Sequence, residues 1–71
     1  MDRSAFAQRL VGLRAERSLS QYKLAEALGF SRGQIANYEQ GSREPDHATL
    51  QQLADFFGVS VDYLLGRTEV R

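Results

Sequence analysis

The chain has 71 residues, a formal net charge of zero and no cysteine, so it suits one small domain without disulfides or a thiolate zinc site. Its single histidine, His47, makes a catalytic triad or a multi-histidine metal site hard to build, and we expect neither an enzyme nor a cofactor. No run approaches the ~20 apolar residues of a membrane span, and the N-terminus lacks the apolar core of a signal peptide, so a cytoplasmic protein is expected.

The first predicted helix runs from Asp2 or Arg3 to Arg17. Its apolar residues fall at i, i+4 and i+7, a spacing that puts one stripe into the core. These residues are Phe6, Leu10 and Leu13. Three arginines lie off the stripe and are expected to face solvent: Arg3, Arg9 and Arg17.

The second predicted helix begins at Ser20, a good cap, and ends at Gly29, which can adopt a left-handed conformation. The third begins at Ser31, forms an S-x-x-Q capping box with Gln34 and ends at Gly41. The side chains expected to be buried on this pair of helices and the turn between them are Leu24, Ala25, Leu28, Phe30, Ile35 and Tyr38.

The fourth predicted helix follows Pro45, is capped by Asp46 and ends at Gly58. The fifth is short, is capped by Ser60 and ends at Gly66. The core face of the fourth helix consists of Leu50, Leu53, Ala54 and Phe57. No stretch alternates with period two, so the predicted fold is all-α.

The charges divide unequally along the predicted domain. Residues 1–43 carry seven basic and four acidic residues, whereas residues 44–71 carry two basic and five acidic ones. The zero net charge argues mildly against a nucleic-acid partner, but the positive part contains residues 20–41, and this asymmetry could orient the domain on DNA. The alternative is that the asymmetry reflects chance or solubility. The domain is expected to cover residues 1–66, with a frayed tail at 67–71.

Residues 20–41 meet the requirements of two helices that cross over a tight turn. Ala25 is small where the helices cross, Gly29 tolerates positive φ in the turn, and Ile35 is a branched anchor opposite Ala25. Such a helix-turn-helix presents its second helix to the DNA major groove. The alternative from these residues alone is a generic helical hairpin with no DNA role, because a fold does not fix a function.

Short motifs from Phe6 to Gly66 resemble those of one family of repressors. They are Leu19-Ser20-Gln21, Leu24-Ala25, Leu28-Gly29, Ser31 to Ile35, Tyr38 to Gly41, Arg43-Glu44-Pro45, Leu50 with Leu53-Ala54, and Gly58 to Leu65. Together they are similar to the Cro/cI repressor-type (XRE-like) helix-turn-helix family. The resemblance implies a compact five-helix, lambda repressor-like domain that is dimeric on DNA and regulates transcription, most often as a repressor.

Four residues at the start of the third predicted helix are candidates for reading bases: Arg32, Gly33, Ala36 and Asn37. Arg32 could bond bidentately to guanine, Asn37 could pair with adenine, and Ala36 could touch a thymine methyl group. Gly33 has no side chain, so it either lets the backbone approach closely or weakens specificity. The alternatives are a solvated or phosphate-bound arginine at position 32 and a local surface amide at position 37.

Five residues are candidates for phosphate contacts: Gln21, Tyr22, Lys23, Gln34 and Arg43. The resemblance puts Gln21 against a phosphate, at a helix start whose amides and dipole favour an anion. Such contacts set register and affinity but carry no sequence information directly. The alternative for Lys23 is an exposed, solubilising charge.

Arg14 and Glu39 have a different expected role. In the family that the chain resembles, an arginine and a glutamate at the matching positions form a largely buried ion pair. The resemblance therefore implies a structural pair that ties the first helix to the end of the third.

Phe56 lies off the core face of the fourth predicted helix, and an exposed aromatic residue can mark a partner surface. With Val61, Tyr63 and Leu65 it forms the candidate dimer surface, unless Phe56 is half-buried against the fifth helix.

The expected partner is duplex DNA with a near-palindromic operator, bound by a homodimer that forms at least on DNA, and the expected location is the nucleoid when DNA is bound. No membrane and no small-molecule ligand are expected. The rival function is a protein–protein interaction or antitoxin-like dimerisation module, which fits the zero net charge and Gly33 better.

Overall fold

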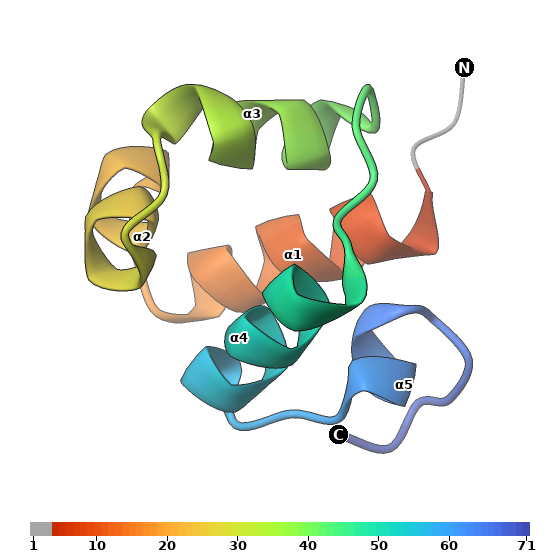
Figure 1. Ribbon diagram of the computed structural model, residues 1–71. Helices are drawn as coiled ribbons and strands as arrows, with labels where there is room; N and C mark the ends of the chain where they lie inside the picture. The colour runs from red at the N-terminus through yellow and green to blue at the C-terminus, as the bar shows by residue number, and fades with distance from the viewer. Residues whose placement is uncertain (1–3) are drawn as a thin grey trace.

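The computed structural model describes residues 4–71, which form five helices. They are α1 (Ala5–Glu16), α2 (Gln21–Leu28), α3 (Arg32–Gln40), α4 (His47–Phe57) and α5 (Val61–Leu64). Residues 4–71 contain no strand, so the prediction of an all-α fold is confirmed. In Figure 1, α3 lies across the top, α2 stands at the left, α1 runs below α3, and α4 and α5 close the lower side.

Each of the last four helices begins after the residue that the sequence predicts as its cap. Side-chain oxygens of Ser20, Ser31, Asp46 and Ser60 accept a hydrogen bond from the backbone N–H three residues later, at 2.8–3.1 Å. These bonds satisfy amides that a helix start leaves free. The caps therefore fix where α2, α3, α4 and α5 begin.

The start of α1 differs from the prediction. Ser4 has an extended backbone and its Oγ accepts a hydrogen bond from the N–H of Ala7 at 3.1 Å, so the helix begins at Ala5. The predicted starts, Asp2 and Arg3, lie outside the described residues. Ser4 competes for the backbone amides as a cap, and the apolar stripe alone could not locate that boundary.

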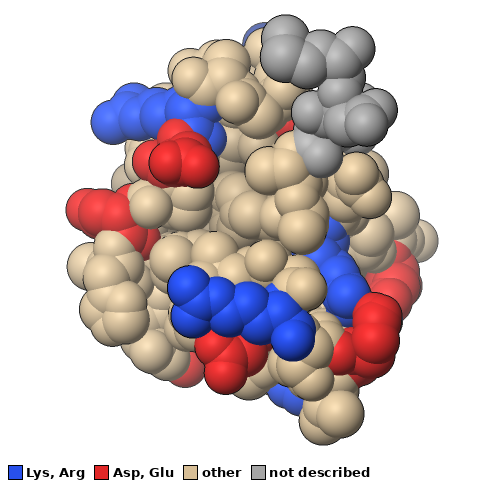
Figure 2. Space-filling model, turned by 90° about the vertical axis from the view of Figure 1, so that its right-hand side faces the viewer, with Lys and Arg blue, Asp and Glu red and all other residues tan. Residues whose placement is uncertain are grey.

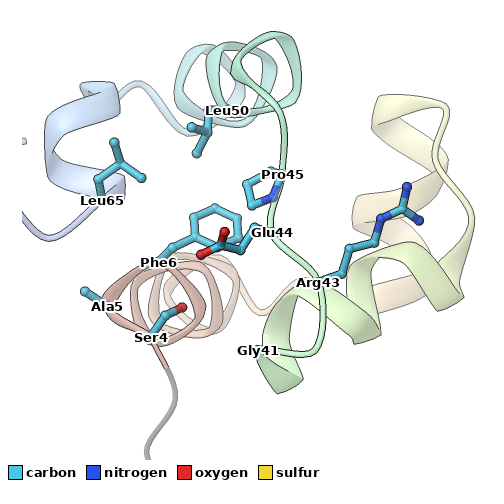
Figure 3. Close-up of a pocket in the computed structure, with 9 residues that line it drawn as sticks. All are labelled: Ser4, Ala5, Phe6, Gly41, Arg43, Glu44, Pro45, Leu50 and Leu65. Carbon is cyan, nitrogen blue, oxygen red and sulfur yellow. The ribbon is translucent and has the colours of Figure 1, made fainter.

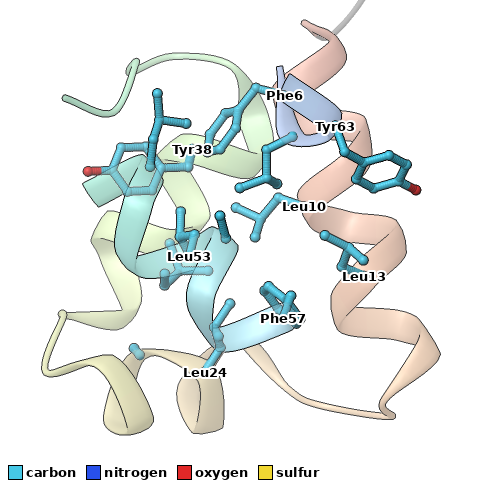
Figure 4. Packing of buried hydrophobic residues seen from close by; sticks show 13 residues of the cluster. Phe6, Leu10, Leu13, Leu24, Tyr38, Leu53, Phe57 and Tyr63 are labelled. Atoms are coloured by element: carbon cyan, nitrogen blue, oxygen red, sulfur yellow. The ribbon is translucent and has the colours of Figure 1, made fainter. Parts of the chain in front are cut away.

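The core is a single cluster to which all five helices contribute (Figure 4). Its buried members are Phe6, Leu10, Leu13, Leu24, Ala25, Ile35, Tyr38, Leu50, Leu53, Ala54, Phe57, Tyr63 and Leu64. Every residue predicted for the core is buried except Leu28 and Phe30, which are half-buried and pack against its edge. Burying a leucine or isoleucine side chain contributes about 1.5–3 kcal/mol, so this cluster is the main source of stability.

Arg17 is exposed over much of its surface, yet it does not simply face solvent as predicted. Its guanidinium donates hydrogen bonds to the carbonyl oxygens of Phe56 and Phe57, each at 3.1 Å. These carbonyls lie at the end of α4, where a cation is favoured because the carbonyls have no helical partner. Arg17 therefore joins the end of α1 to the end of α4.

Residues 67–71, which the sequence predicts to be frayed, fold back on the domain, and we call this segment the clasp. The backbone N–H of Ser60 donates to the carbonyl oxygen of Arg71 at 2.8 Å. Val70 is 77% exposed, so the clasp is held by polar and charged groups rather than by apolar burial.

Two ion pairs attach the clasp to α1. Arg9 donates to Glu69 at 2.6 and 3.1 Å, and the guanidinium of Arg71 pairs with both carboxylate oxygens of Glu16. One basic and one acidic residue of α1 therefore meet one acidic and one basic residue of the clasp. The prediction that Arg9 faces solvent is wrong, because its guanidinium is bonded to Glu69 of the clasp.

The clasp also covers Tyr63 of α5. The guanidinium carbon of Arg9 lies 4.0 Å from the centre of the Tyr63 ring, and that of Arg71 lies 5.3 Å from it. An arginine over an aromatic face is attracted by the charge distribution of the ring. Tyr63 is consequently 8% exposed although α5 is a surface helix.

Loss of the clasp should be visible in the titration of Glu16. The hydrogen bonds from Arg71 hold the pKa of Glu16 below its ordinary value of 4.5. The Arg71–Glu16 pair therefore stabilises the fold at neutral pH, and this stabilisation is lost as pH falls through the lowered pKa. Arg71→Ala is expected to raise the pKa of Glu16, measured by NMR of its side-chain carboxyl carbon. Arg67→Ala, which removes an exposed arginine 3.8 Å from Asp62, is the control and should leave that pKa unchanged. An unaltered pKa of Glu16 in Arg71→Ala would contradict a docked clasp.

Candidate nucleic-acid interface

Helices α2 and α3 pack against each other over the turn predicted from the sequence. Ala25 and Ile35 are 2% and 0% exposed, as expected for the small residue and its branched anchor at the crossing. Gly29 has a φ of 75°, so the turn uses the conformation that glycine adopts without strain. The helix-turn-helix is therefore present, with α3 as its second helix.

The side chains of α3 separate into two faces. Ile35, Tyr38 and Glu39 are buried against the rest of the domain. Three of the four candidate base-reading residues are exposed, namely Arg32, Gly33 and Asn37, while Ala36 is half-buried. The start of α3 thus presents a polar, accessible surface on a rigid element.

Gly33 is not required by packing. A Cβ added there would find only the Oγ of Ser31, at 4.0 Å, and the backbone of Gly33 is not left-handed. Because the domain leaves room for a side chain, glycine at this position keeps the outer surface of α3 flat. A flat surface lets the α3 backbone approach a partner closely.

The five candidate phosphate contacts divide into two groups. Tyr22 is 56% exposed, and Lys23 and Arg43 are also exposed. In Figure 3 the Arg43 side chain extends away from the loop and from the apolar residues beside it. Lys23 Nζ lies 3.8 Å from Glu26, an exposed neighbour that leaves the lysine accessible.

The two glutamines among these candidates are instead partly buried and bonded within the domain. Gln21 Nε2 donates to Glu39 Oε1, and Gln34 Nε2 donates to Tyr38 Oη, each at 3.0 Å. The Gln34 side chain therefore does not return to Ser31, and only one half of the predicted capping box is formed. Each bond uses one of the two N–H groups of the amide, so the phosphate role of the two glutamines stays a prediction.

Arg14 and Glu39 lie together in the interior, as the resemblance implies. Arg14 Nε is 2.6 Å from Glu39 Oε2, and Arg14 Nη2 is 2.9 Å from Oε1, which is the two-bond geometry of a strong arginine–carboxylate pair. The Glu39 side chain is 6% exposed. The hydrogen bond from Arg14 to Glu39 also raises the pKa of Arg14, so the guanidinium stays charged.

The exposed charges on α2, on α3 and in the loop after α3 are of both signs. Lys23, Arg32 and Arg43 are accompanied there by Glu26, Glu44 and Asp46, whereas Glu39 is neutralised by Arg14. Figure 2 shows the side of the molecule away from α2, where acidic and basic side chains lie next to each other. On α2 and α3 themselves, Lys23 and Arg32 exceed the exposed carboxylate of Glu26 by one charge, so the helix-turn-helix is only slightly positive.

The candidate dimer surface is only partly accessible. The prediction that Tyr63 belongs to this surface is wrong, because Arg9 and Arg71 cover its ring and it is buried within one chain. Phe56 is half-buried, with its ring 5.1 Å from that of Phe57 in an edge-to-face contact and 5.4 Å from the Arg17 guanidinium carbon. Val61 and Leu65 are half-buried as well.

A cavity of about 310 Å³ lies between the start of α1, the loop after α3, the start of α4 and the end of α5 (Figure 3). Its apolar wall includes Phe6, Pro45, Leu50 and Leu65. Apart from Arg43, none of the candidate DNA-contacting residues lines it.

Within residues 4–71, no group of three histidine, aspartate or glutamate side chains could hold a metal ion. Among the helices described, none is long and apolar enough to cross a membrane.

The chain is similar to known helix-turn-helix proteins. The helix-turn-helix family model matches residues 12–64. The chain is 42% identical over 60 residues to the uncharacterized HTH-type transcriptional regulator YqaE of Bacillus subtilis, covering 84% of this chain and 52% of YqaE. It is 36% identical over 59 residues to the immunity repressor protein of Bacillus phage phi105, covering 83% of this chain and 41% of the repressor.

A solved structure gives the same result. A transcriptional regulator from Listeria innocua matches with a TM-score of 0.82 and 34% identity, over 92% of this chain and 61% of that one. The chain spans about half the length of the curated relatives it matches. The match to the family model and the identity to these relatives show that the chain belongs to the helix-turn-helix family, and the resemblance to its Cro/cI-type (XRE-like) members is confirmed.

Proposed function

We propose that this domain binds duplex DNA sequence-specifically, with α3 in the major groove, and that the protein represses transcription. The observation that carries the proposal is the division of α3 into a buried apolar face and an exposed face with Arg32, Gly33 and Asn37, inside a helix-turn-helix. Regulators and a repressor among the relatives support the transcriptional role. The proposal assigns no catalytic step and places the protein in the cytoplasm, on the nucleoid when DNA is bound.

The contacts would divide between bases and phosphates. Arg32 would bond to guanine, Asn37 to adenine and Ala36 to a thymine methyl group, while the flat surface at Gly33 would let α3 lie deep in the groove. Tyr22, Lys23 and Arg43 are exposed and would bind phosphates, together with the backbone amides at the start of α2. Gln21 and Gln34 would each add a contact through the second N–H of the side-chain amide. These phosphate contacts would fix the register in which α3 meets the bases.

We propose further that two copies bind together. A symmetric dimer would place two α3 helices about one turn of DNA apart, ~34 Å, and would select a near-palindromic site. Phe56, Val61 and Leu65 remain the apolar residues available for the contact, since each is only half-buried, whereas Tyr63 is covered by the clasp. A paired site doubles the number of phosphate contacts, which a domain of zero net charge needs.

Selection from a random duplex pool, followed by titration of the enriched duplex, tests this function. Arg32→Ala and Asn37→Ala are each expected to weaken binding to that duplex by about 1–3 kcal/mol and to relax the preference at one base pair. Arg67→Ala is the matched control, because it also removes one exposed arginine but lies beyond α5. It should change the affinity little.

The rival is a protein–protein interaction or antitoxin-like dimerisation module on the same fold. DNA binding predicts a steep fall of affinity with salt and enrichment of two related half-sites. If no sequence is enriched and Arg32→Ala binds any duplex as well as Arg67→Ala does, the DNA function is wrong. Salt-insensitive binding to a protein partner would then favour the rival.

A further inference from the structure

The surface under the clasp presents charges in a fixed order. Arg9 pairs with Glu69, and Glu16 pairs with Arg71. The backbone N–H of Ser60 donates to the carbonyl oxygen of Arg71, so the end of the clasp lies beside the connection from α4 to α5 (Figure 1). We call Arg9, Glu16 and Ser60 the clasp site. Its groups select a short segment in which an acidic residue stands two positions before a basic one.

The clasp can leave this site at low cost. The side chains that make its ion pairs are largely solvated, since Glu69 is 81% exposed, and Arg71 and Glu16 are 48% and 50% exposed. Ion pairs in such surroundings contribute little to stability one by one. Val70, the apolar residue of the clasp, is not buried. We therefore expect the clasp to open locally far more often than the domain unfolds.

Only part of the clasp is free to move when it opens. The backbone N–H of Arg67 donates to the carbonyl oxygen of Asp62 at 3.0 Å, which ties the first clasp residue to α5. The remaining residues, 68–71, span at most about 14 Å when extended. The clasp site of another copy is within that reach only if the copy is seated directly against α5.

The candidate dimer surface would seat a second copy there. Val61 and Leu65 belong to α5 and the residue that caps its end, and with Phe56 they are the half-buried apolar residues of this surface. Stable interfaces bury about 800 Å² on each partner, which is more than three half-buried side chains can supply. A dimer on this surface therefore needs further contacts, and the clasp follows α5 directly.

We propose that two copies exchange clasps across the candidate dimer surface, so that the clasp of each copy binds the clasp site of the other. This inference rests on the pairing of two copies proposed above, although it does not require DNA. Every ion pair between the clasp and its site is made again between the chains, so the exchange itself costs little, and the apolar contact adds to it. Exchange in both directions gives a closed, symmetric dimer.

Charge reversal in two separate chains tests the exchange. Arg9→Glu in one chain and Glu69→Arg in another each oppose like charges within their own chain. In an exchanged dimer with one copy of each, the intact Glu69 meets the intact Arg9, and the two substituted positions meet with opposite charges. Both ion pairs are therefore regained, and they can be regained only between chains.

Sedimentation equilibrium of each variant and of their equimolar mixture measures the association. The mixture should form a dimer whose dissociation constant is at least about tenfold lower than that of either variant alone, because two exposed ion pairs are regained together. Arg9→Glu combined with Glu69→Arg in one chain should associate like the wild type. The variants Glu16→Arg and Arg71→Glu repeat the test on the second ion pair, and they serve if Arg9→Glu does not fold.

The matched control reverses an exposed ion pair that the exchange cannot divide. Arg67 and Asp62 lie 3.8 Å apart, and the hydrogen bond between their backbones keeps both with α5. Asp62→Arg and Arg67→Glu, mixed in the same way, should associate no more than about twofold more tightly than each does alone.

The outcomes separate this inference from the function on which it rests. Equal association of the mixture and of each single variant would overturn the exchange and leave another mode of pairing. A wild type and a mixture that both remain monomers would overturn it too, while enrichment of two half-sites would still show pairing on DNA. A mixture-specific dimer that binds no duplex would defeat the DNA-binding function alone.

Discussion

Glu39→Ala is expected to lower the free energy of unfolding by about 3 kcal/mol, the lower end for breaking a buried pair, because it leaves the guanidinium of Arg14, whose side chain is 21% exposed, without its carboxylate. The side-chain amide of Gln21 would lose its acceptor, Glu39 Oε1, at the same time. A domain of this size has a total stability of roughly 4–10 kcal/mol, so a large part of it would be lost. Urea unfolding followed by circular dichroism measures the change.

The control for this prediction is Glu26→Ala, which removes an exposed glutamate from α2. Glu26 lies 3.8 Å from Lys23 in an i, i+3 pair, and such pairs contribute only about 0.2–0.5 kcal/mol. A similar loss in both variants would show that Glu39 contributes no more than a surface charge. Arg14→Met with Glu39→Leu should recover part of the loss, but not all of it, since the Gln21 amide and the Leu19 carbonyl would stay unpaired.

Gly66→Ala is expected to destabilise the domain by about 2–5 kcal/mol. Gly66 has a φ of 77°, where an L-residue costs about 1–2 kcal/mol. A Cβ added there would also overlap the Cβ of Ala5 at the start of α1, and forcing an extra methyl into a packed site costs about 1–3 kcal/mol. Thermal or urea unfolding of the variant gives the combined effect.

Gly58→Ala is a matched control for this effect. Gly58 has a φ of 67° but open space around its missing side chain, so alanine there should show only the conformational cost of about 1–2 kcal/mol. Adding Ala5→Gly to Gly66→Ala should relieve the overlap and bring the loss close to that of Gly58→Ala. Equal losses in the two single variants would contradict a close approach of Gly66 to α1.

Local signals in the sequence were enough to predict most of the fold. Ser20, Ser31, Asp46 and Ser60 cap the helices that follow them, because a cap acts on amides only three residues away. The exposed surface of α3 follows from the same kind of reasoning. Once the helical period puts Ile35 and Tyr38 in the core, residues such as Arg32 and Asn37 must lie on the outer side.

The contacts missed from the sequence join residues far apart in the chain. Arg9 and Glu69 are 60 residues apart, and Arg17 and Phe56 are 39 apart, so neither pair leaves a local pattern. Charged residues off the apolar stripe of α1 were therefore expected to be solvated. The seven-residue spacing of Arg9 and Glu16 puts opposite charges on one face of α1. That spacing was the one local indication that this face of α1 could bind another charged segment.

The candidate DNA-binding site could be predicted from the sequence about as far as the fold could. Arg32, Gly33 and Asn37 were located by helical periodicity, and the Arg14–Glu39 contact was expected only from the family resemblance. The inward orientation of Gln21 was not expected, because the first residue of a helix can point either way. Its direction is set by Glu39, 18 residues later, whose Oε1 accepts the amide of Gln21.

Helix α1 and the residue that caps its end carry three arginines that each hold a different remote segment. Arg9 binds the clasp, Arg14 binds the end of α3, and Arg17 binds the end of α4. Detaching α1 alone would break all three attachments and uncover Leu10 and Leu13 in a single step. Partial opening of the domain therefore costs nearly as much as complete opening, and α1, α3 and α4 form one cooperative unit despite the short length of the chain.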